Sequence, residues 1–357
     1  MTHIQPNIHL LTLGGTIAMR QERGALDLTP GSAALADVIG RLELPRPVAV
    51  SEFRNVPSGN ILFRDLIALA KRIEALHAAG CTGIIVTQGT DTIEETAFAL
   101  ELLVQAPINI VVTGAMRGAS HVSADGPANI QAAVEFLCDS AATGEVVVAL
   151  DDVFHAARFV RKSHTTRLSA FTSGERPIRG RLHEGGFRAF APPLVALPKI
   201  SIAEAGARPN VLLLPICLDQ DPAYLERICQ LGLDGLVIDA FGAGHVPQNL
   251  VPAFEAQAAR LPVVLCSRTA DGLLCTHTYG YPGAEIDLLS RGLLNGDWLT
   301  GIKARILLTL LLMEPGAAVR SRFCATVQHQ EGHGARAAAS ENDAMDLHAA
   351  ASQWSSQ

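Results

Sequence analysis

The chain has 357 residues, of which 48% are hydrophobic, and its formal net charge at pH 7 is -7. This length supplies enough apolar side chain for a sizeable core and is typical of two domains. The acidic balance lacks the basic surface with which proteins bind nucleic acid or anionic lipid, so we expect neither a nucleic-acid nor a membrane partner.

The cysteines and the apolar runs predict a cytoplasmic protein. Seven cysteines are scattered among apolar residues without a C-x-x-C pair, which is typical of reduced thiols. The amino terminus has no cationic region before its first apolar run, so we expect no cleavable signal peptide. The apolar run over 306–313 is far shorter than the roughly 20 residues of a spanning helix, and it predicts a buried helix instead.

Strand-like and helix-like segments alternate in the first half of the chain. Short runs rich in β-branched residues predict strands over 8–13, 83–87, 108–113 and 145–150. Stretches with apolar residues at helical spacing lie between them, over 65–78, 93–104 and 127–140. This order predicts an α/β fold with a doubly wound, mostly parallel sheet in a larger N-terminal domain.

The second half predicts a smaller α/β domain. Strands are expected over 211–214, 235–239 and 262–267, and helices over 223–231, 250–260 and 298–313. A proline-rich, irregular stretch precedes them, and a segment with little periodicity follows them. We therefore divide the chain into an N-terminal catalytic domain (1–190), a linker (191–209), a C-terminal domain (210–327) and a disordered tail (328–357).

Two predicted strands end in a glycine turn that delivers a threonine. The segment T-L-G-G-T-I-A at 12–18 presents Thr16, and T-Q-G-T-D-T-I-E-E-T at 87–96 presents Thr90 beside Asp91. The carboxyl ends of parallel strands line the crevice where such sheets bind ligands, so these turns predict a site with two nucleophile-grade hydroxyls. The alternatives are that Thr16 caps the following segment and that Asp91 is the N-cap of the next helix.

Two further segments carry candidate catalytic groups. A third strand ends at 113–117, where the backbone N–H of Ala115 is a candidate oxyanion donor or part of an ordinary strand exit. Lys162 follows a short connection after the fourth strand. A lysine that is desolvated beside Thr90 loses its proton more easily and acts as a base, whereas a solvated surface lysine does not.

Together, these segments resemble the bacterial type of L-asparaginase, an amidohydrolase family that includes the glutaminase-asparaginases. The two threonine signatures match in order and separation, and the similarity covers residues 8–323. The resemblance implies hydrolysis of L-asparagine to L-aspartate and ammonia through an acyl-enzyme. It implies a small amino-acid substrate, and the mechanism requires no cofactor and no metal.

The resemblance also implies roles for particular residues. Thr16 would be the nucleophile, and Thr90 would form a hydrogen-bonded triad with Lys162 and Asp91. Asp91 would also hold the α-amino group of the substrate.

The resemblance implies that three residues from two other turns would also contact the substrate. Ser58 and the adjacent Gly59 would bind the α-carboxylate, and the backbone of Ala115 would lie beside the amide oxygen.

The C-terminal half would contribute to a site shared between subunits. Glu285 matches the glutamate that reaches a neighbouring subunit and contacts the substrate amine; the alternative is a solvent-facing loop carboxylate. The family forms close dimers that pair into tetramers, so the resemblance implies a homodimer or homotetramer with shared active sites.

The chain departs from the family pattern at two places. Family members often carry a tyrosine in the flap after the first threonine, whereas residues 19–29 contain none and the only tyrosines are Tyr224, Tyr279 and Tyr281. His245 stands where the family usually has asparagine, near the shared edge of the substrate site. Histidine is larger than asparagine and gains charge near neutral pH, so one interpretation is a changed substrate selectivity or pH optimum of the enzyme. The alternative is that His245 only caps or packs the turn.

Other functions remain open on the same pattern. Glutaminase activity is one, and the amide-hydrolysing component of a tRNA-dependent amidotransferase is another, although that component typically has an extra domain before the first strand, which begins here at Ile8. A dinucleotide-binding enzyme is disfavoured because no G-x-G-x-x-G follows the first strand. A non-catalytic amino-acid sensor would bind without releasing ammonia.

A bound metal is not expected from the histidines near the C-terminus. His329, His333 and His348 have no acidic or cysteine ligands at metal spacing.

Overall fold

A computed structural model describes residues 8–15, 17, 20–22, 25–27, 31–139, 144–202 and 206–329. Thr16 therefore lies outside the described residues, as do His333, His348 and the rest of the predicted tail from residue 330 onward. In the described part of the chain, no helix is long and apolar enough to span a membrane.

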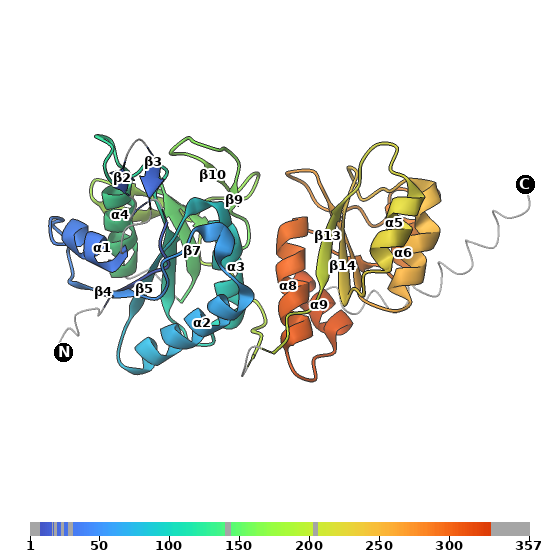
Figure 1. The fold of residues 1–357 in the computed structure, drawn as a ribbon, viewed down its shortest axis with the longest axis horizontal. Helices are drawn as coiled ribbons and strands as arrows, with labels where there is room; N and C mark the ends of the chain where they lie inside the picture. Colours follow the sequence, from blue (N-terminus) through green and yellow to red (C-terminus); the bar gives the residue numbers. More distant parts are fainter. Residues whose placement is uncertain are drawn as a thin grey trace, which may run out of the picture.

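An eight-stranded sheet forms the centre of the N-terminal part, with the order β12-β11-β8-β7-β6-β5-β1-β4 (Figure 1). Its parallel strands are β4 (Val48–Glu52), β1 (Ile8–Thr12), β5 (Gly83–Thr87), β6 (Asn109–Thr113) and β7 (Val146–Leu150). Three antiparallel strands, β8 (Val153–Ala156), β11 (Gly180–His183) and β12 (Gly186–Ala189), extend one edge. The predicted doubly wound, mostly parallel sheet is confirmed.

Helices cover both faces of this sheet. The helices are α1 (Gly31–Ile39), α2 (Phe63–Ala78), α3 (Ile93–Leu103) and α4 (Gly126–Cys138). Alternate residues of β5 point to opposite faces, so Ile84 and Val86 pack with α2 and α3, while Ile85 packs with α1 and α4. Because both faces are covered, all five residues of β5 are buried, which explains its continuous apolar sequence.

The C-terminal part has a parallel four-stranded sheet. Its strands are β13 (Val211–Pro215), β14 (Gly235–Ala240), β15 (Val263–Ser267) and β16 (Leu294–Asn295). The helices are α5 (Pro222–Cys229), α6 (Val251–Ala258), α7 (Glu285–Ser290), α8 (Gly301–Met313) and α9 (Val319–Gln328). The buried helix predicted over 306–313 is the C-terminal part of α8, where residues 306–311 are buried.

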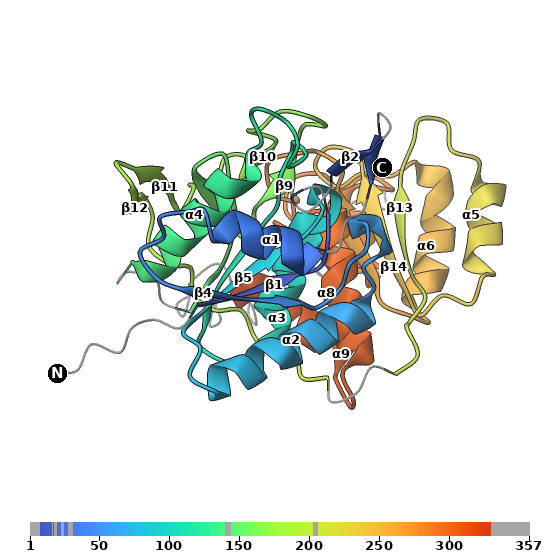
Figure 2. The ribbon, with the colours of Figure 1, turned by 60° about the vertical axis from the view of Figure 1, so that its left-hand side comes forward.

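The two parts share one hydrophobic cluster. Helix α8 lies beside α3 (Figures 1 and 2), and its leucines belong to the same cluster as the inner residues of α2 and α3. Phe98 of α3 meets the ring of Trp298 edge to face at 6.4 Å. Between β12 and β13 the described residues form no helix or strand. The domain boundaries given above stay a prediction.

Several short elements were not predicted. Besides α1, β4, β8, β11, β12, α7, β16 and α9, these are two small antiparallel pairs, β2 (Arg20–Glu22) with β3 (Ala25–Asp27) and β9 (Arg161–Lys162) with β10 (Phe171–Thr172). The strand β9 positions the candidate catalytic lysine.

Candidate active site

Three parallel strands of the N-terminal sheet end at one level. Thr87 of β5 lies opposite Thr12 of β1 and Thr113 of β6, and all three threonines are fully buried. The turns that follow these strands therefore leave the sheet side by side, at the edge where open α/β sheets bind ligands.

The two predicted threonine turns meet in space. Gly15 has φ +91°, and a Cβ at this position would lie 2.1 Å from the backbone nitrogen of Gly89. A Cβ on Gly89 would in turn lie 2.8 Å from the hydroxyl of Ser58. Only glycine allows so close a backbone approach, so the glycines of both signatures bring the turns and Ser58 together.

Lys162 joins the second turn from β9. Its Nζ donates to Thr90 Oγ1 at 2.8 Å and to Asp91 Oδ1 at 2.7 Å. The lysine side chain is 16% exposed and the aspartate side chain 79% exposed. Lys162 is thus not a solvated surface lysine, and Asp91 pairs with it instead of capping α3, whose N-cap residue is Thr92.

Two residues that the sequence analysis did not identify brace this arrangement. The buried side chain of Gln88 donates to Thr92 Oγ1 at 3.0 Å, and the Thr92 hydroxyl donates to the Ser58 carbonyl at 3.1 Å. Both lie inside the second signature, but the signature does not show what they contact. This chain of bonds fixes the Ser58 turn to the end of β5.

The turn after β6 is held by an aspartate at the start of α4. Asp125 accepts hydrogen bonds from the backbone N–H groups of Met116 and Arg117, each at 2.9 Å. Asn129 donates to the Gly114 carbonyl at 3.0 Å. These bonds fix the backbone on both sides of the buried Ala115.

A cavity of about 240 Å³ lies where the turns converge. It is lined by Gly15, Pro57, Ser58, Gly59, Gly89, Thr90, Asp91, Ala115, Met116, Lys162 and Thr165. The structure therefore brings together the described site residues predicted from the N-terminal half, and Gly15 of the first threonine signature lines the same cavity.

Glu285 and His245 lie together in the C-terminal part but are not among the residues that line this cavity. The Glu285 carboxylate accepts from the N–H groups of Thr278 and Tyr279 and lies 3.3 Å from His245 Nε2. The Tyr281 hydroxyl is 3.1 Å from His245 Nδ1.

The alternative of a solvent-facing carboxylate at residue 285 is wrong, because Glu285 begins α7 and is fully buried. Although burial alone would raise the pKa of Glu285, hydrogen bonds from the Tyr279 and Thr278 backbone and from His245 lower it below its ordinary value.

The cavity residues suit chemistry at an amide of a small zwitterion. A hydroxyl beside a lysine amine is the pairing that activates an oxygen nucleophile when the amine is neutral. The exposed carboxylate of Asp91 can meet an ammonium group, and the Ser58 hydroxyl can meet a carboxylate. Within the described ranges, no group of three or more His, Cys, Asp or Glu side chains is arranged to hold a metal ion.

Comparisons with known proteins agree with this geometry. Residues 7–194 match the family model "Asparaginase, N-terminal", and residues 210–319 match "Glutaminase/Asparaginase C-terminal domain". A probable L-asparaginase of Deinococcus radiodurans is 37% identical over 86% of this chain and 93% of its own length. A component of the glutamyl-tRNA(Gln) amidotransferase of Methanosarcina barkeri is 29% identical over 82% of this chain and 70% of its own length.

A solved structure shows the same fold. The crystal structure of a probable cytoplasmic L-asparaginase from Campylobacter jejuni has a TM-score of 0.78 and 26% identity, and the match covers 90% of this chain and all of that one. With both halves of the chain matched in order, the protein belongs to the asparaginase family of hydrolases.

Proposed function

We propose that the protein hydrolyses the side-chain amide of L-asparagine to give L-aspartate and ammonia. The observation that carries this proposal is the contact of Lys162 with both Thr90 and Asp91 at the wall of a cavity that also holds Ser58. The name of the Deinococcus radiodurans relative, which shares 37% identity, supports the choice of substrate.

In the proposed reaction, the Thr16 hydroxyl attacks the amide carbonyl. The new C–O bond gives a tetrahedral intermediate whose C–N bond then breaks, and the nitrogen leaves as ammonia with the proton taken from the nucleophile. Water hydrolyses the resulting threonine ester and releases L-aspartate. Thr90 and Lys162 carry protons in both halves, which their 2.8 Å contact supports.

Substrate binding uses the groups at the rim of the cavity. Asp91 pairs with the α-ammonium group, and Ser58 with Gly59 holds the α-carboxylate. The turn at Ala115 presents the backbone to the amide oxygen, and Asp125 fixes that turn. These roles fix the distance between the two charged ends and therefore favour a short side-chain amide.

We also propose that the working enzyme is a homodimer or homotetramer with shared sites. His245 and Glu285 do not line the cavity of their own chain, so a role for them in substrate binding requires a second copy. Sedimentation analysis of the purified protein tests this, and a monomer with full activity would contradict it.

The proposed compartment is the cytoplasm. All seven cysteines are free, which suits a reducing environment. The name of the Campylobacter jejuni structure describes a cytoplasmic protein as well.

A second candidate is amide hydrolysis within a tRNA-dependent amidotransferase. The relatives named as components of glutamyl-tRNA(Gln) amidotransferase support it, but they are less similar, with 29% identity for the Methanosarcina barkeri protein against 37% for the Deinococcus protein. Glutaminase activity is a further candidate, because the C-terminal family model names glutaminase as well as asparaginase.

The test is ammonia release from L-asparagine, with L-glutamine and D-asparagine in parallel, by the purified protein and its Thr16→Ala and Thr90→Ala variants. Rapid release from L-asparagine that both substitutions abolish supports the proposal. Thr269→Ala, in an exposed loop, is the matched control and should keep the wild-type rate. A folded protein that releases no ammonia from any of the three amides would instead favour an amino-acid sensor.

A further inference from the structure

The strand that carries Lys162 is too short to be rigid by itself. β9 has two residues and pairs only with the equally short β10 in the described sheets. A catalytic side chain must be held to within roughly 0.5 Å by packing and by second contacts. Contacts outside this small sheet therefore determine where the lysine amine lies.

Two hydrogen bonds hold the backbone on either side of Arg161. The Val160 carbonyl accepts a hydrogen bond from Lys303 Nζ at 2.5 Å, and the Lys162 N–H donates to Glu94 Oε1 at 3.1 Å. Glu94 belongs to α3, whereas Lys303 comes from α8 in the C-terminal part.

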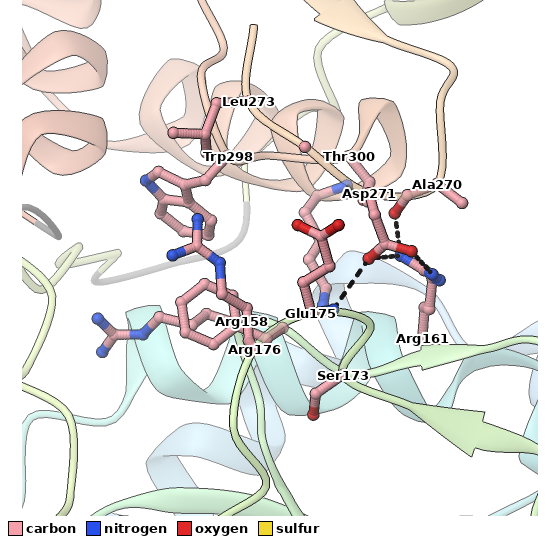
Figure 3. A pocket seen from close by; sticks show the side chains of 13 residues that line it. Arg158, Arg161, Ser173, Glu175, Arg176, Ala270, Asp271, Leu273, Trp298 and Thr300 are labelled. Atoms are coloured by element: carbon pink, nitrogen blue, oxygen red, sulfur yellow. Dashed lines mark hydrogen bonds and ion pairs between the residues drawn. The ribbon is translucent and has the colours of Figure 1, made fainter.

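A third contact holds the side chain of Arg161. Its guanidinium pairs with Asp271, with Nη2 at 2.7 Å from Oδ2, and also contacts the Ala270 carbonyl (Figure 3). This ion pair is partly exposed. Because partly exposed ion pairs stabilise proteins little, we expect it to contribute less to the position of β9 than the contacts of Lys303 and Glu94 do.

Burying the amine of Lys303 carries a desolvation cost. It is 1% exposed, it lines a pocket together with Arg161 and Trp298, and its amine lies 5.9 Å from the centre of the Phe98 ring (Figure 3). Burial lowers the pKa of Lys303 to about 8, although Glu94 and Glu101 oppose this shift. An apolar side chain would pack here without the desolvation cost, so what lysine adds is a donor for the Val160 carbonyl and a positive charge near Glu94 and Glu101.

We infer that Lys303 is a positioning residue: by holding the Val160 carbonyl from the C-terminal part, it fixes β9 so that the Lys162 amine lies against Thr90 and Asp91. This inference rests on the proposed role of Lys162 in amide hydrolysis. It makes the C-terminal part a determinant of the reaction rate within one chain, separate from any residue offered to a second subunit.

The hydrogen bond of Lys303 is not what joins the two parts of the molecule. The shared hydrophobic cluster does so, with Phe98, Trp298 and the inner face of α8. Removing the amine should therefore loosen β9 while leaving the overall fold in place.

The test replaces the amine and compares it with a matched lysine. Lys303→Met keeps the length of the side chain but has no donor. Lys199→Met is the control, because Lys199 is also a partly buried lysine whose amine donates to a backbone carbonyl, that of Glu101 at 2.7 Å, rather than to the backbone beside β9. For Lys303→Met we expect a 30- to 100-fold lower kcat, of the order that a misplacement of about 1 Å costs, with KM within about threefold of wild type.

Hydrogen exchange gives a readout that does not depend on activity. The amide of Lys162 should exchange at least about tenfold faster in Lys303→Met than in wild type and should be unchanged in Lys199→Met. Should Lys303→Met not fold, Lys303→Gln, which keeps a donor on a shorter chain, should show losses in the same direction but smaller.

Each outcome decides the inference. A kcat within threefold of wild type in folded Lys303→Met, or unchanged exchange at Lys162, overturns it, and so do equal losses of kcat in Lys199→Met. A wild-type protein without amidase activity would refute the proposed function, and the exchange experiment would still decide whether Lys303 holds β9.

Discussion

Thr90 and Lys162 are 72 residues apart in the sequence, yet their side chains form one unit. The threonine is 8% exposed, so little solvent competes for its hydroxyl. Replacing it by valine keeps the shape but removes the hydroxyl. We expect Thr90→Val to lower kcat/KM at least about 1000-fold, because the loss of a nucleophile or proton carrier costs several orders of magnitude.

Thr90→Ser is the control for this prediction. It restores the hydroxyl without the methyl group and should stay within about tenfold of wild type in steady-state ammonia release. Similar activity of the valine and serine variants would show that the hydroxyl takes no part in the reaction.

The contact between Gly15 and Gly89 leads to a prediction about assembly of the site. A methyl group at residue 15 would meet the Gly89 backbone and would also impose a strained positive φ. We expect Gly15→Ala to lower the free energy of unfolding by roughly 2–4 kcal/mol, measured by urea denaturation, and to remove activity by separating the turns. Gly186→Ala, where no atom lies within 4 Å of the added Cβ, should be close to neutral.

Local signatures made some site residues predictable and not others. The turns that contain Thr90, Asp91 and Ser58 can be recognised from the residues next to them in the sequence. The contacts that position Lys162 could not be predicted in this way. Glu94 accepts a hydrogen bond from a backbone N–H 68 residues away, and Lys303 donates one to a carbonyl 143 residues away. Such partners become visible only when the chain is folded.

At the level of elements, an ion pair connects the antiparallel strands β11 and β12 to the parallel part of the N-terminal sheet. Arg179 donates to both carboxylate oxygens of Glu145, which stands just before β7, and it also contacts the Ala191 carbonyl after β12. The arginine side chain is 2% exposed and the glutamate side chain 11% exposed. Removing the glutamate would leave a buried guanidinium without its counter-ion.

We therefore expect Glu145→Ala to lower the free energy of unfolding by roughly 3–5 kcal/mol in urea denaturation. The ion pair between Asp37 of α1 and Arg41 just after that helix provides the comparison, because both side chains are more than half exposed. Asp37→Ala should cost less than about 1 kcal/mol. Equal effects of the two changes would mean that burial of the Glu145 pair does not determine its contribution.

The same contrast explains which elements could be predicted. β5 and β7 are completely buried runs rich in β-branched residues, so their sequence alone identifies them. β11 and β12 are four residues each and partly exposed, and β9 and β10 have only two residues. Two residues are too few to show alternation and four are at the lower limit, so long-range pairing rather than local preference determines these strands.

At the scale of the whole molecule, Lys303 couples stability to pH. Its pKa in the folded protein is about 8, against an ordinary value of 10.5, because burial disfavours the charged amine. Between these values the unfolded chain binds a proton that the folded chain does not, so this group makes the protein more stable as the pH rises. Below pH 8 both states are protonated, and the full cost of burying the charge is present.

Denaturation of wild type and Lys303→Met at pH 7 and pH 10 measures this effect. The free energy of unfolding of wild type should rise relative to the variant by up to roughly 3 kcal/mol between the two pH values. Both proteins contain the same cysteines and tyrosines, so the titration of those groups cancels. A difference that does not change with pH would show that the buried amine keeps its proton.

Helices α3 and α8 bury their apolar faces against each other within one cluster, so the peptide that connects the two halves is not what keeps them together. Two polypeptides encoded separately, one ending and the other beginning within residues 191–209, should find each other through this surface and restore the site. Neither fragment should be active alone, because the first lacks the lysine that holds β9 and the second lacks the threonines. Ammonia release on mixing the two halves would therefore measure their association.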